Sequence, residues 1–220
     1  MTFKTLIFII CSLFSLAVYA ATDVENHIHK LPAKGTVALT FDDGPSKIYT
    51  PQILAILKKY NIKATFFMVG TNAKSHPDLV KQVLADGHAI NSHSQTHPML
   101  TKLNDAQLKW EVTEPTVIIY KITGKKIACL RYPFGASNEH VRTVIRTSGL
   151  VPVPMGFNSF DYDRPGTDKI VSWVLQNAYS GQVILLHDGY DKREQTVAAL
   201  PRIIEGIKQK GLGFSQICVG

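Results

Sequence analysis

The sequence predicts an α/β fold in which parallel strands form a sheet with helices outside it. Short apolar segments alternate with longer segments of helical periodicity along the chain, and polar residues directly follow several of the apolar segments. The chain has 220 residues, of which 45% are hydrophobic and 19% charged, which suits one globular domain with a sizeable core. Periodicity alone leaves open whether the strands form an open sheet or a barrel.

Seven segments are expected to be strands, because each is short, largely apolar and bounded by turn residues. The first is followed by two aspartates, and the sixth ends on a histidine. In chain order the expected strands are Val37–Phe41, Ala64–Val69, His88–Ser92, Ile127–Tyr132, Leu150–Phe157, Val183–His187 and Gly213–Val219.

Six segments between the strands have helical patterns. In the first, Ile53 and Leu57 contribute to an apolar face and Lys58 lies off it. We expect Pro115 to break or kink the third helix, because proline lacks the backbone N–H that a helix interior needs. In chain order the expected helices are Pro51–Tyr60, Pro77–Asp86, Asp105–Ile122, Glu139–Ser148, Asp168–Ala178 and Thr196–Lys210.

The first 20 residues predict a secretory signal peptide. A short positive start ends at Lys4, Leu6 to Val18 is almost wholly apolar, and Ala20 completes a small-x-small cleavage pattern. An uncleaved membrane anchor is the less favoured alternative, because the apolar run is short for a spanning helix. We therefore expect residues 1–20 to be a signal peptide, 21–34 an N-terminal extension and 35–220 the folded domain. The mature protein would be periplasmic or secreted, without stable membrane insertion.

Two cysteines, Cys129 and Cys218, remain after the expected cleavage. In an oxidising compartment they could form a disulfide, and the alternative is two small buried thiols. The sequence does not decide between these, because the distance between the two residues in space is unknown.

The net charge of +7 at pH 7 favours contact with anionic polymers and envelope surfaces. The lysines are scattered, and no basic block with interleaved aromatic residues is present. We therefore do not expect a nucleic-acid partner, and we expect a monomer.

Asp42 and Asp43 are adjacent at the end of the first expected strand. Alone, such a pair followed by Gly-Pro is more typical of a turn with Asx hydrogen bonds. If both side chains were buried, however, they would repel each other unless a cation lay beside them. A cation that binds one carboxylate would hold it ionised and leave the neighbouring carboxylate free to act as a base.

His93 and His97 are four residues apart, so a helix or a tight loop would direct both imidazoles to one point. Two imidazoles and one carboxylate make a three-ligand site for a divalent metal, with one position left open. Taken alone, two nearby histidines are more often surface or core residues. His88 has no such partner, and we interpret it as structural.

Two further strand ends carry residues that are suited to catalysis. Arg131 has a planar guanidinium that can hold a carboxylate, and a backbone N–H in the loop that follows could face a developing oxyanion. Alone, such an arginine is usually part of a salt bridge. His187 ends an apolar strand and suits general acid catalysis, although a structural histidine is an equally good interpretation.

In this order along the chain, these segments resemble the motifs of the polysaccharide deacetylase family, carbohydrate esterase family 4, whose domain is called the NodB-homology domain. TFDDG resembles the first motif, HSxxH at His93–His97 the second, RYPFG at Arg131–Gly135 the third and LLHD at Leu185–Asp188 the fifth. The resemblance covers residues 35–220, which it makes the catalytic domain. It implies a distorted (β/α) barrel, usually of seven strands.

The resemblance also implies roles for individual residues. Asp43, His93 and His97 resemble the metal ligands of the family, and Asp42 resembles its general base. The remaining roles are those of Arg131, which orients Asp42; His187, the general acid; the Phe134 backbone N–H, part of the oxyanion hole; and Leu185, a wall of the pocket for the acetyl methyl group.

The fourth motif departs from the family pattern, which is commonly Asp-x-x-Asp-Trp. Asp161 occupies the position that pairs with the acid histidine, so that role can carry over. Asn158 replaces the first aspartate, and Tyr162 replaces a tryptophan that lines the pocket. These two departures make the substrate harder to infer than the chemistry.

The resemblance implies a hydrolase that removes N-acetyl groups from a glycan of N-acetylglucosamine and releases acetate. Peptidoglycan, chitin-type oligomers and poly-N-acetylglucosamine all stay open as substrates. Zinc is the expected metal for two histidines and one aspartate, and cobalt or nickel could replace it. One alternative is an O-acetyl esterase acting on xylan or another glycan with the same metal site. An alternative of another class is a non-catalytic glycan-binding protein, which the complete set of catalytic positions disfavours.

Overall fold

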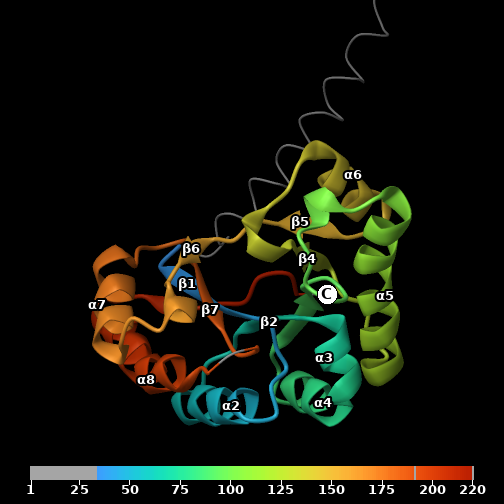
Figure 1. Cartoon of the computed structure of the whole chain (residues 1–220). Helices are drawn as coiled ribbons and strands as arrows, with labels where there is room; N and C mark the ends of the chain where they lie inside the picture. The colour runs from blue at the N-terminus through green and yellow to red at the C-terminus, as the bar shows by residue number, and fades with distance from the viewer. Residues whose placement is uncertain (1–33, 191, 220) are drawn as a thin grey trace, which may run out of the picture.

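The computed structural model describes residues 34–190 and 192–219, and it contains a curled parallel sheet surrounded by helices (Figure 1). The strand order is β5-β4-β3-β2-β1-β7-β6, and every ladder along it is parallel. These seven strands confirm the expected distorted (β/α) barrel. They are β1 (Thr36–Asp42), β2 (Thr65–Met68), β3 (Ala89–Ser92), β4 (Cys129–Arg131), β5 (Val151–Val153), β6 (Phe157–Asn158) and β7 (Val183–His187).

Helices cover the outside of the curled sheet in Figure 1. Helix α5 begins with a capping box, in which the Asn104 side chain accepts the backbone N–H of Gln107 and the Gln107 side chain accepts that of Asn104. The helices are α2 (Tyr49–Tyr60), α3 (Gly70–Ser75), α4 (Pro77–Ala85), α5 (Asp105–Thr123), α6 (Glu139–Thr147), α7 (Thr167–Asn177) and α8 (Glu194–Gln209), with three short turns η1 (Leu100–Lys102), η2 (Pro133–Gly135) and η3 (Asp161–Asp163).

The largest core cluster lies between the central strands and the outer helices. Phe41 of β1 stacks on Phe66 of β2 with ring centroids 5.1 Å apart, and both side chains are fully buried. On α8, Ile203 and Ile207 are fully buried one turn apart in the same cluster. Each such side chain contributes about 1.5–3 kcal/mol through burial. The central strands are therefore held rigidly, and so are the residues at their ends.

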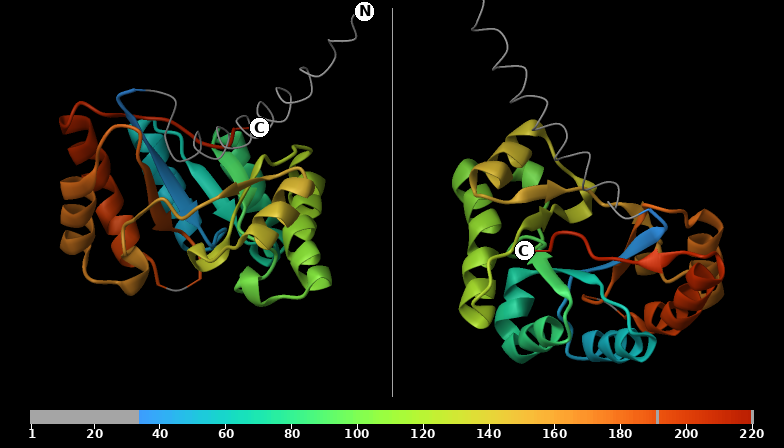
Figure 2. Two further views of the ribbon diagram at one scale, coloured as in Figure 1. Left: turned by 90° about the horizontal axis from the view of Figure 1, so that it is seen from above. Right: turned by 180° about the vertical axis from the view of Figure 1, so that it is seen from behind.

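The C-terminal segment closes the end of the barrel at which the strands begin. Its Ile217 packs inside the barrel and exchanges hydrogen bonds with Thr65 at the start of β2. The following Cys218 forms a disulfide with Cys129 of β4, so the pairing that the sequence left open is present. Figure 2 shows this red segment crossing the strand ends from β8 (Gly213–Phe214) toward β4. The opposite end, where the strands finish, is the one that stays open.

The expected strand 150–157 is wrong as a single element, because the structure divides it into β5 and β6. Pro152 and Pro154 have no backbone N–H to donate to a ladder. Gly156 has a φ of +78°, and a Cβ there would lie 2.8 Å from the carbonyl oxygen of Val183. The chain therefore turns at residues 154–156, and β5 and β6 stand at the two ends of the strand order.

Three other elements differ from expectation. Helix α5 continues through Pro115, so of the expected break or kink, a break is absent. Losing one helical hydrogen bond costs about 1 kcal/mol, which the buried side chains of α5 outweigh. The last expected strand is limited to β8, and α3 was not expected. Within the described residues no helix is long and apolar enough to span a membrane. The expected signal peptide 1–20 and extension 21–34 lie outside those residues, apart from Lys34.

Candidate active site

A cavity of about 370 Å³ opens where the strands end, and it collects nine of the ten site residues expected from the sequence. The tenth, Asp161, lies behind His187 and is bonded to it. The cavity is lined by Asp42, Asp43, His93, His97, Arg131, Tyr132, Phe134, Gly135, Met155, Tyr162, Leu185 and His187. Side chains from the ends of four strands and from the loops beyond them therefore meet in one space, as is usual for active sites of α/β barrels.

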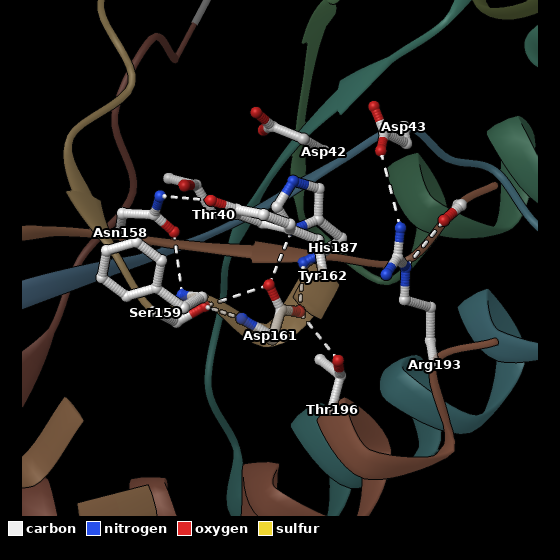
Figure 3. Close-up of polar contacts among 12 residues, drawn as sticks. Thr40, Asp42, Asp43, Asn158, Ser159, Asp161, Tyr162, His187, Arg193 and Thr196 are labelled. Carbon is white, nitrogen blue, oxygen red and sulfur yellow. Dashed lines mark hydrogen bonds and ion pairs between the residues drawn. The ribbon is translucent and has the colours of Figure 1, made fainter. Parts of the chain in front are cut away.

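The two adjacent aspartates both line the cavity, although neighbouring side chains of a strand normally point to opposite faces. Strand β1 ends at Asp42, and Asp43 adopts a left-handed φ of 75°. This turn interrupts the alternation, and Figure 3 shows the two carboxylates side by side at the strand end. A non-glycine residue with this backbone is uncommon and often marks a functional position.

Asp43, His93 and His97 form a cluster whose potential ligand atoms all lie within 4.8 Å of one another. Asp43 Oδ1 lies 3.3 Å from His97 Nε2 and 3.6 Å from His93 Nε2. The same oxygen is buried and has no hydrogen-bond partner among the described residues, which is costly for a carboxylate. One carboxylate and two imidazoles are the donor set of a divalent metal site with an open position. The residues thus fit a bound divalent cation, as the sequence predicted.

The proton positions on the two histidines also suit metal binding. His93 Nδ1 lies 2.7 Å from the backbone carbonyl oxygen of Arg131. Because a carbonyl can only accept, Nδ1 carries the proton and Nε2 presents its lone pair to the cluster. Burial of the His97 ring, reinforced by the nearby His93, lowers its pKa to about 4, so this imidazole is neutral at physiological pH.

The segment between the two histidines is a tight loop, one of the two forms that the sequence allowed. Ser94 has a φ of 68° and His97 a φ of 62°. The carboxylate of Glu111, on α5, accepts the backbone N–H groups of Gln95 and Thr96 at 2.8 Å each. It also accepts the Thr96 hydroxyl. Glu111 therefore fixes the loop that positions His97, and its side chain is buried.

Arg131 holds the second aspartate of the pair. Its Nη1 donates to Asp42 Oδ1 at 2.7 Å and to Thr40 Oγ1 at 2.8 Å, and its guanidinium lies 4.1 Å over the Phe67 ring. Burial lowers the pKa of Arg131, and the charge of Asp42 opposes that shift. A buried guanidinium with these partners fixes the orientation of the Asp42 carboxylate.

His187 and Asp161 form a buried pair, as expected from the sequence. His187 Nδ1 lies 2.7 Å from Asp161 Oδ1, and Asp161 also accepts bonds from the His187 backbone N–H, Ser159 and Thr196 (Figure 3). Burial opposes the charged imidazole, but the charge and hydrogen bond of Asp161 outweigh it and raise the pKa of His187 to about 9. The same interactions outweigh burial at Asp161 and lower its pKa.

Several residues of the site had no role expected from the sequence, although Asp188 belongs to the LLHD motif. Arg193 is buried beside the aspartates, with Nη2 3.9 Å from Asp43 Oδ2 and Nε donating to the carbonyl of Gly189 (Figure 3). Asp188 donates its backbone N–H to the carbonyl of Asp42, and burial with the nearby aspartates raises its carboxyl pKa to about 7. Glu111 could have been noticed in the sequence, because it interrupts the apolar face of α5. Arg193 gave no such signal.

Apolar and aromatic side chains line the rest of the cavity. Leu185 is buried in the cavity wall, and Phe134, of which only the backbone N–H was expected to have a role, places its ring edge-on to His97 with centroids 4.6 Å apart. Tyr162 packs edge-on against the His187 ring, with centroids 5.5 Å apart. The cavity thus has an apolar wall, a charged base and aromatic rings at its rim.

Comparison with known proteins shows that this chain is similar to deacetylases that act on glycans. The sequence matches a family model described as polysaccharide deacetylase over residues 29–153, more than half of the chain. A peptidoglycan-N-acetylglucosamine deacetylase of Bacillus cereus is 38% identical over 180 residues, which cover 81% of this chain and 84% of that protein. A chitooligosaccharide deacetylase of Sinorhizobium fredii is 34% identical over 207 residues, with 84% and 94% covered.

Solved structures share the fold. A peptidoglycan N-acetylglucosamine deacetylase in complex with a benzamide has a TM-score of 0.82 and 33% identity, and the match covers 86% of this chain and 88% of that one. A CE4 family pseudoenzyme from Bacillus anthracis has a TM-score of 0.79 and 26% identity, over 84% of this chain and 65% of that one. Both a deacetylase and a pseudoenzyme have this fold, so activity depends on the residues in the cavity rather than on the fold.

Proposed function

Because this chain belongs to the polysaccharide deacetylase family, we propose that it hydrolyses the N-acetyl group of N-acetylglucosamine units in a glycan and releases acetate. The observation that carries the proposal is the meeting of three groups in one cavity. These are the candidate metal ligands Asp43, His93 and His97, the Arg131–Asp42 pair and the Asp161–His187 pair. Amide hydrolysis needs a base for the attacking water and an acid for the departing amine, and the cavity offers one of each.

Asp43, His93 and His97 would hold a divalent cation, for which zinc is our choice because of the two imidazoles. When bound, such a cation polarises a carbonyl oxygen and lowers the pKa of water. The buried, unpartnered Oδ1 of Asp43 supports this assignment. Glu111 supports it as well, because it fixes the loop that carries His97.

Asp42 acts as the general base. Arg131 occupies its Oδ1, so the carboxylate keeps one orientation, and Oδ2 lies 3.7 Å from His93 Nε2 at the metal site. A water that attacks the acetyl carbonyl beside that site can give its proton to Oδ2. Because the guanidinium holds Oδ1, Oδ2 is the oxygen that faces the metal site and can accept the proton.

His187 acts as the general acid. Its pKa of about 9 keeps the ring protonated at neutral pH, and its Nδ1 is committed to Asp161. Nε2 is therefore the atom that delivers a proton to the amine nitrogen as the C–N bond breaks. An amine leaves poorly without this proton, so the raised pKa of His187 fits amide cleavage. The Phe134 backbone N–H would donate to the oxyanion, an interaction of about 3 kcal/mol in comparable sites.

The location of the protein belongs to the same proposal. We propose that residues 1–20 direct export and that the mature chain acts on an envelope or external glycan. The Cys129–Cys218 disulfide supports this, because disulfides persist mainly in oxidising compartments. The relatives named for peptidoglycan and for chitooligosaccharides share N-acetylglucosamine as a sugar unit, so we propose that unit as the substrate class.

Acetate release from a panel of glycans tests the proposed function. N-acetylglucosamine oligomers, peptidoglycan strands and acetylxylan are incubated with the protein, with and without a chelator, and mass spectrometry follows the loss of acetyl groups. We expect chelator-sensitive release from the first two substrates. Release from acetylxylan alone would establish the O-acetyl esterase instead. Binding to a glycan without release of acetate would establish the non-catalytic alternative.

A further inference from the structure

Three exposed aromatic side chains extend outward from the cavity as a continuous row. Tyr162 lines the cavity beside His187, with ring centroids 5.5 Å apart. Phe160 follows at 6.2 Å from Tyr162, and Trp173 of α7 follows at 5.9 Å from Phe160. Each of the three is 41% exposed. We call Phe160, Tyr162 and Trp173 the aromatic ledge.

Asn158 holds all three members of the aromatic ledge. Its Oδ1 accepts the backbone N–H of Phe160 at 2.8 Å, and its Nδ2 donates to the Tyr162 hydroxyl at 3.3 Å. Its backbone carbonyl accepts the indole N–H of Trp173 at 3.0 Å. Asn158 is one of the two residues that depart from the fourth family motif, and this role accounts for a side chain that the proposed reaction does not use.

The backbone of Phe160 indicates that the ledge is maintained at a cost. Its φ of 57° is left-handed, a conformation that is unfavourable for a bulky residue. That conformation does not bury the ring. Contiguous exposed aromatic surface next to a pocket is typical of a ligand-binding surface. The aromatic ledge therefore combines a strained residue, a set of fixed rings and a position beside the reacting groups.

We infer that the aromatic ledge binds a further, neutral pyranose unit of the same glycan chain, beyond the unit whose acetyl group enters the cavity. The inference rests on the proposed function. A pyranose ring presents an apolar C–H face that can lie flat on an aromatic ring, while its hydroxyl groups stay in water. Asn158 and the three rings carry no charge, which suits an uncharged sugar. The enzyme then prefers oligomers that reach the ledge over short ones.

The two tryptophans of the chain give a direct spectroscopic test. Trp110 on α5 is 48% exposed, and Figure 1 places α5 on the opposite side of the barrel from α7. In the Trp110→Phe holoenzyme, Trp173 is the only tryptophan. Rapid mixing with chitopentaose should change its emission before turnover, whereas N-acetylglucosamine monosaccharide should not. The Trp173→Phe holoenzyme, which keeps Trp110, should show no change with either sugar.

Steady-state kinetics test the same inference without tryptophan. Phe160→Ala should raise KM for chitopentaose about tenfold and leave KM for chitobiose and kcat for both nearly unchanged. Trp110→Ala is the matched control, and it should leave both KM values unchanged.

The outcomes separate the ledge from the proposed function. If acetate is released but the Trp173 emission is constant and the KM ratio is unaltered, the ledge assignment is wrong and the deacetylase stands. An equal emission change with the monosaccharide would also overturn the ledge. If none of the N-acetylglucosamine sugars releases acetate, the proposed function itself fails.

Discussion

Replacing Asp161 with asparagine should move the pH profile of the reaction, because Asp161 is what keeps His187 protonated. The pKa of His187 is about 9 in the presence of that carboxylate, against an ordinary value of 6.5. At pH 7.5 a group with a pKa of 9 is about 97% protonated, and one with a pKa of 6.5 is about 9% protonated. Without Asp161, only the charges of Asp43 and Asp42 oppose the effect of burial, so the pKa of His187 should fall toward its ordinary value of 6.5.

The Asp161→Asn variant should therefore lose about tenfold or more of kcat/KM at pH 7.5. The basic limb of the pH profile should move down from about pH 9 toward 6.5, so that the activity of the variant relative to the original protein rises as the pH falls. The assay is kcat/KM for acetate release from chitopentaose across pH. Asp163→Asn is the matched control, since Asp163 lies in the same turn and is exposed. A loss that is constant across pH would refute the argument that Asp161 acts through the protonation of His187.

The His187–Asp161 pair also stabilises the fold, by an amount that depends on pH. The pKa of His187 is raised on folding, so its contribution is complete below about pH 6.5 and is lost as the pH rises through about 9. The pKa of Asp161 is lowered, so its contribution is present above about pH 4 and is lost as the pH falls through the folded-state pKa. The shift of His187 corresponds to about 3 kcal/mol of unfolding free energy. Urea unfolding of Asp161→Asn should show that loss at pH 6 and a smaller loss at pH 10.

Two further variants test residues that hold the metal-site loop and the fold in place. Glu111→Gln should weaken metal affinity about 10–100-fold, measured by chelator competition, because the loop that carries His97 loses its charged acceptor; an equal effect of Glu114→Gln, on the same helix, would contradict this. Replacing Cys129 and Cys218 together with serine opens a link of sequence separation 89, which costs about 4.6 kcal/mol in the chain-entropy model. The melting temperature should then fall by about 10 °C while activity at 25 °C persists, and an unchanged melting temperature would show that the disulfide is not a structural support.

The strand-end motifs could be predicted from the sequence because topology brings them together. Parallel strands finish at one edge, so Asp42, His93, Arg131 and His187 converge whatever the details of the loops. Their supporting partners could not be predicted in this way. Glu111 bonds to the loop 16 residues before it, and Thr196 bonds to Asp161 from 35 residues away. Such contacts depend on how an outer helix packs on the sheet, and periodicity does not encode that.

The two ends of the fold also combine features that the sequence predicts with features that it does not. The division of 150–157 into β5 and β6 arises from two prolines and a close approach of Gly156 to Val183. The prolines were visible in the sequence, whereas the approach was not. The disulfide depended on a C-terminal segment that crosses the strand ends, and the seven-strand expectation treated that segment as a strand.

The metal content of two neighbouring variants tests the central assignment most directly. Asp43 Oδ1 faces both histidines and is unpartnered within the described part of the chain, whereas Asp42 Oδ1 is held by Arg131. Asp43→Ala should therefore lose bound metal by elemental analysis. Asp42→Ala should keep its metal and lose turnover. If both variants keep full metal occupancy, Asp43 is not a ligand and the division of the aspartate pair into ligand and base is wrong.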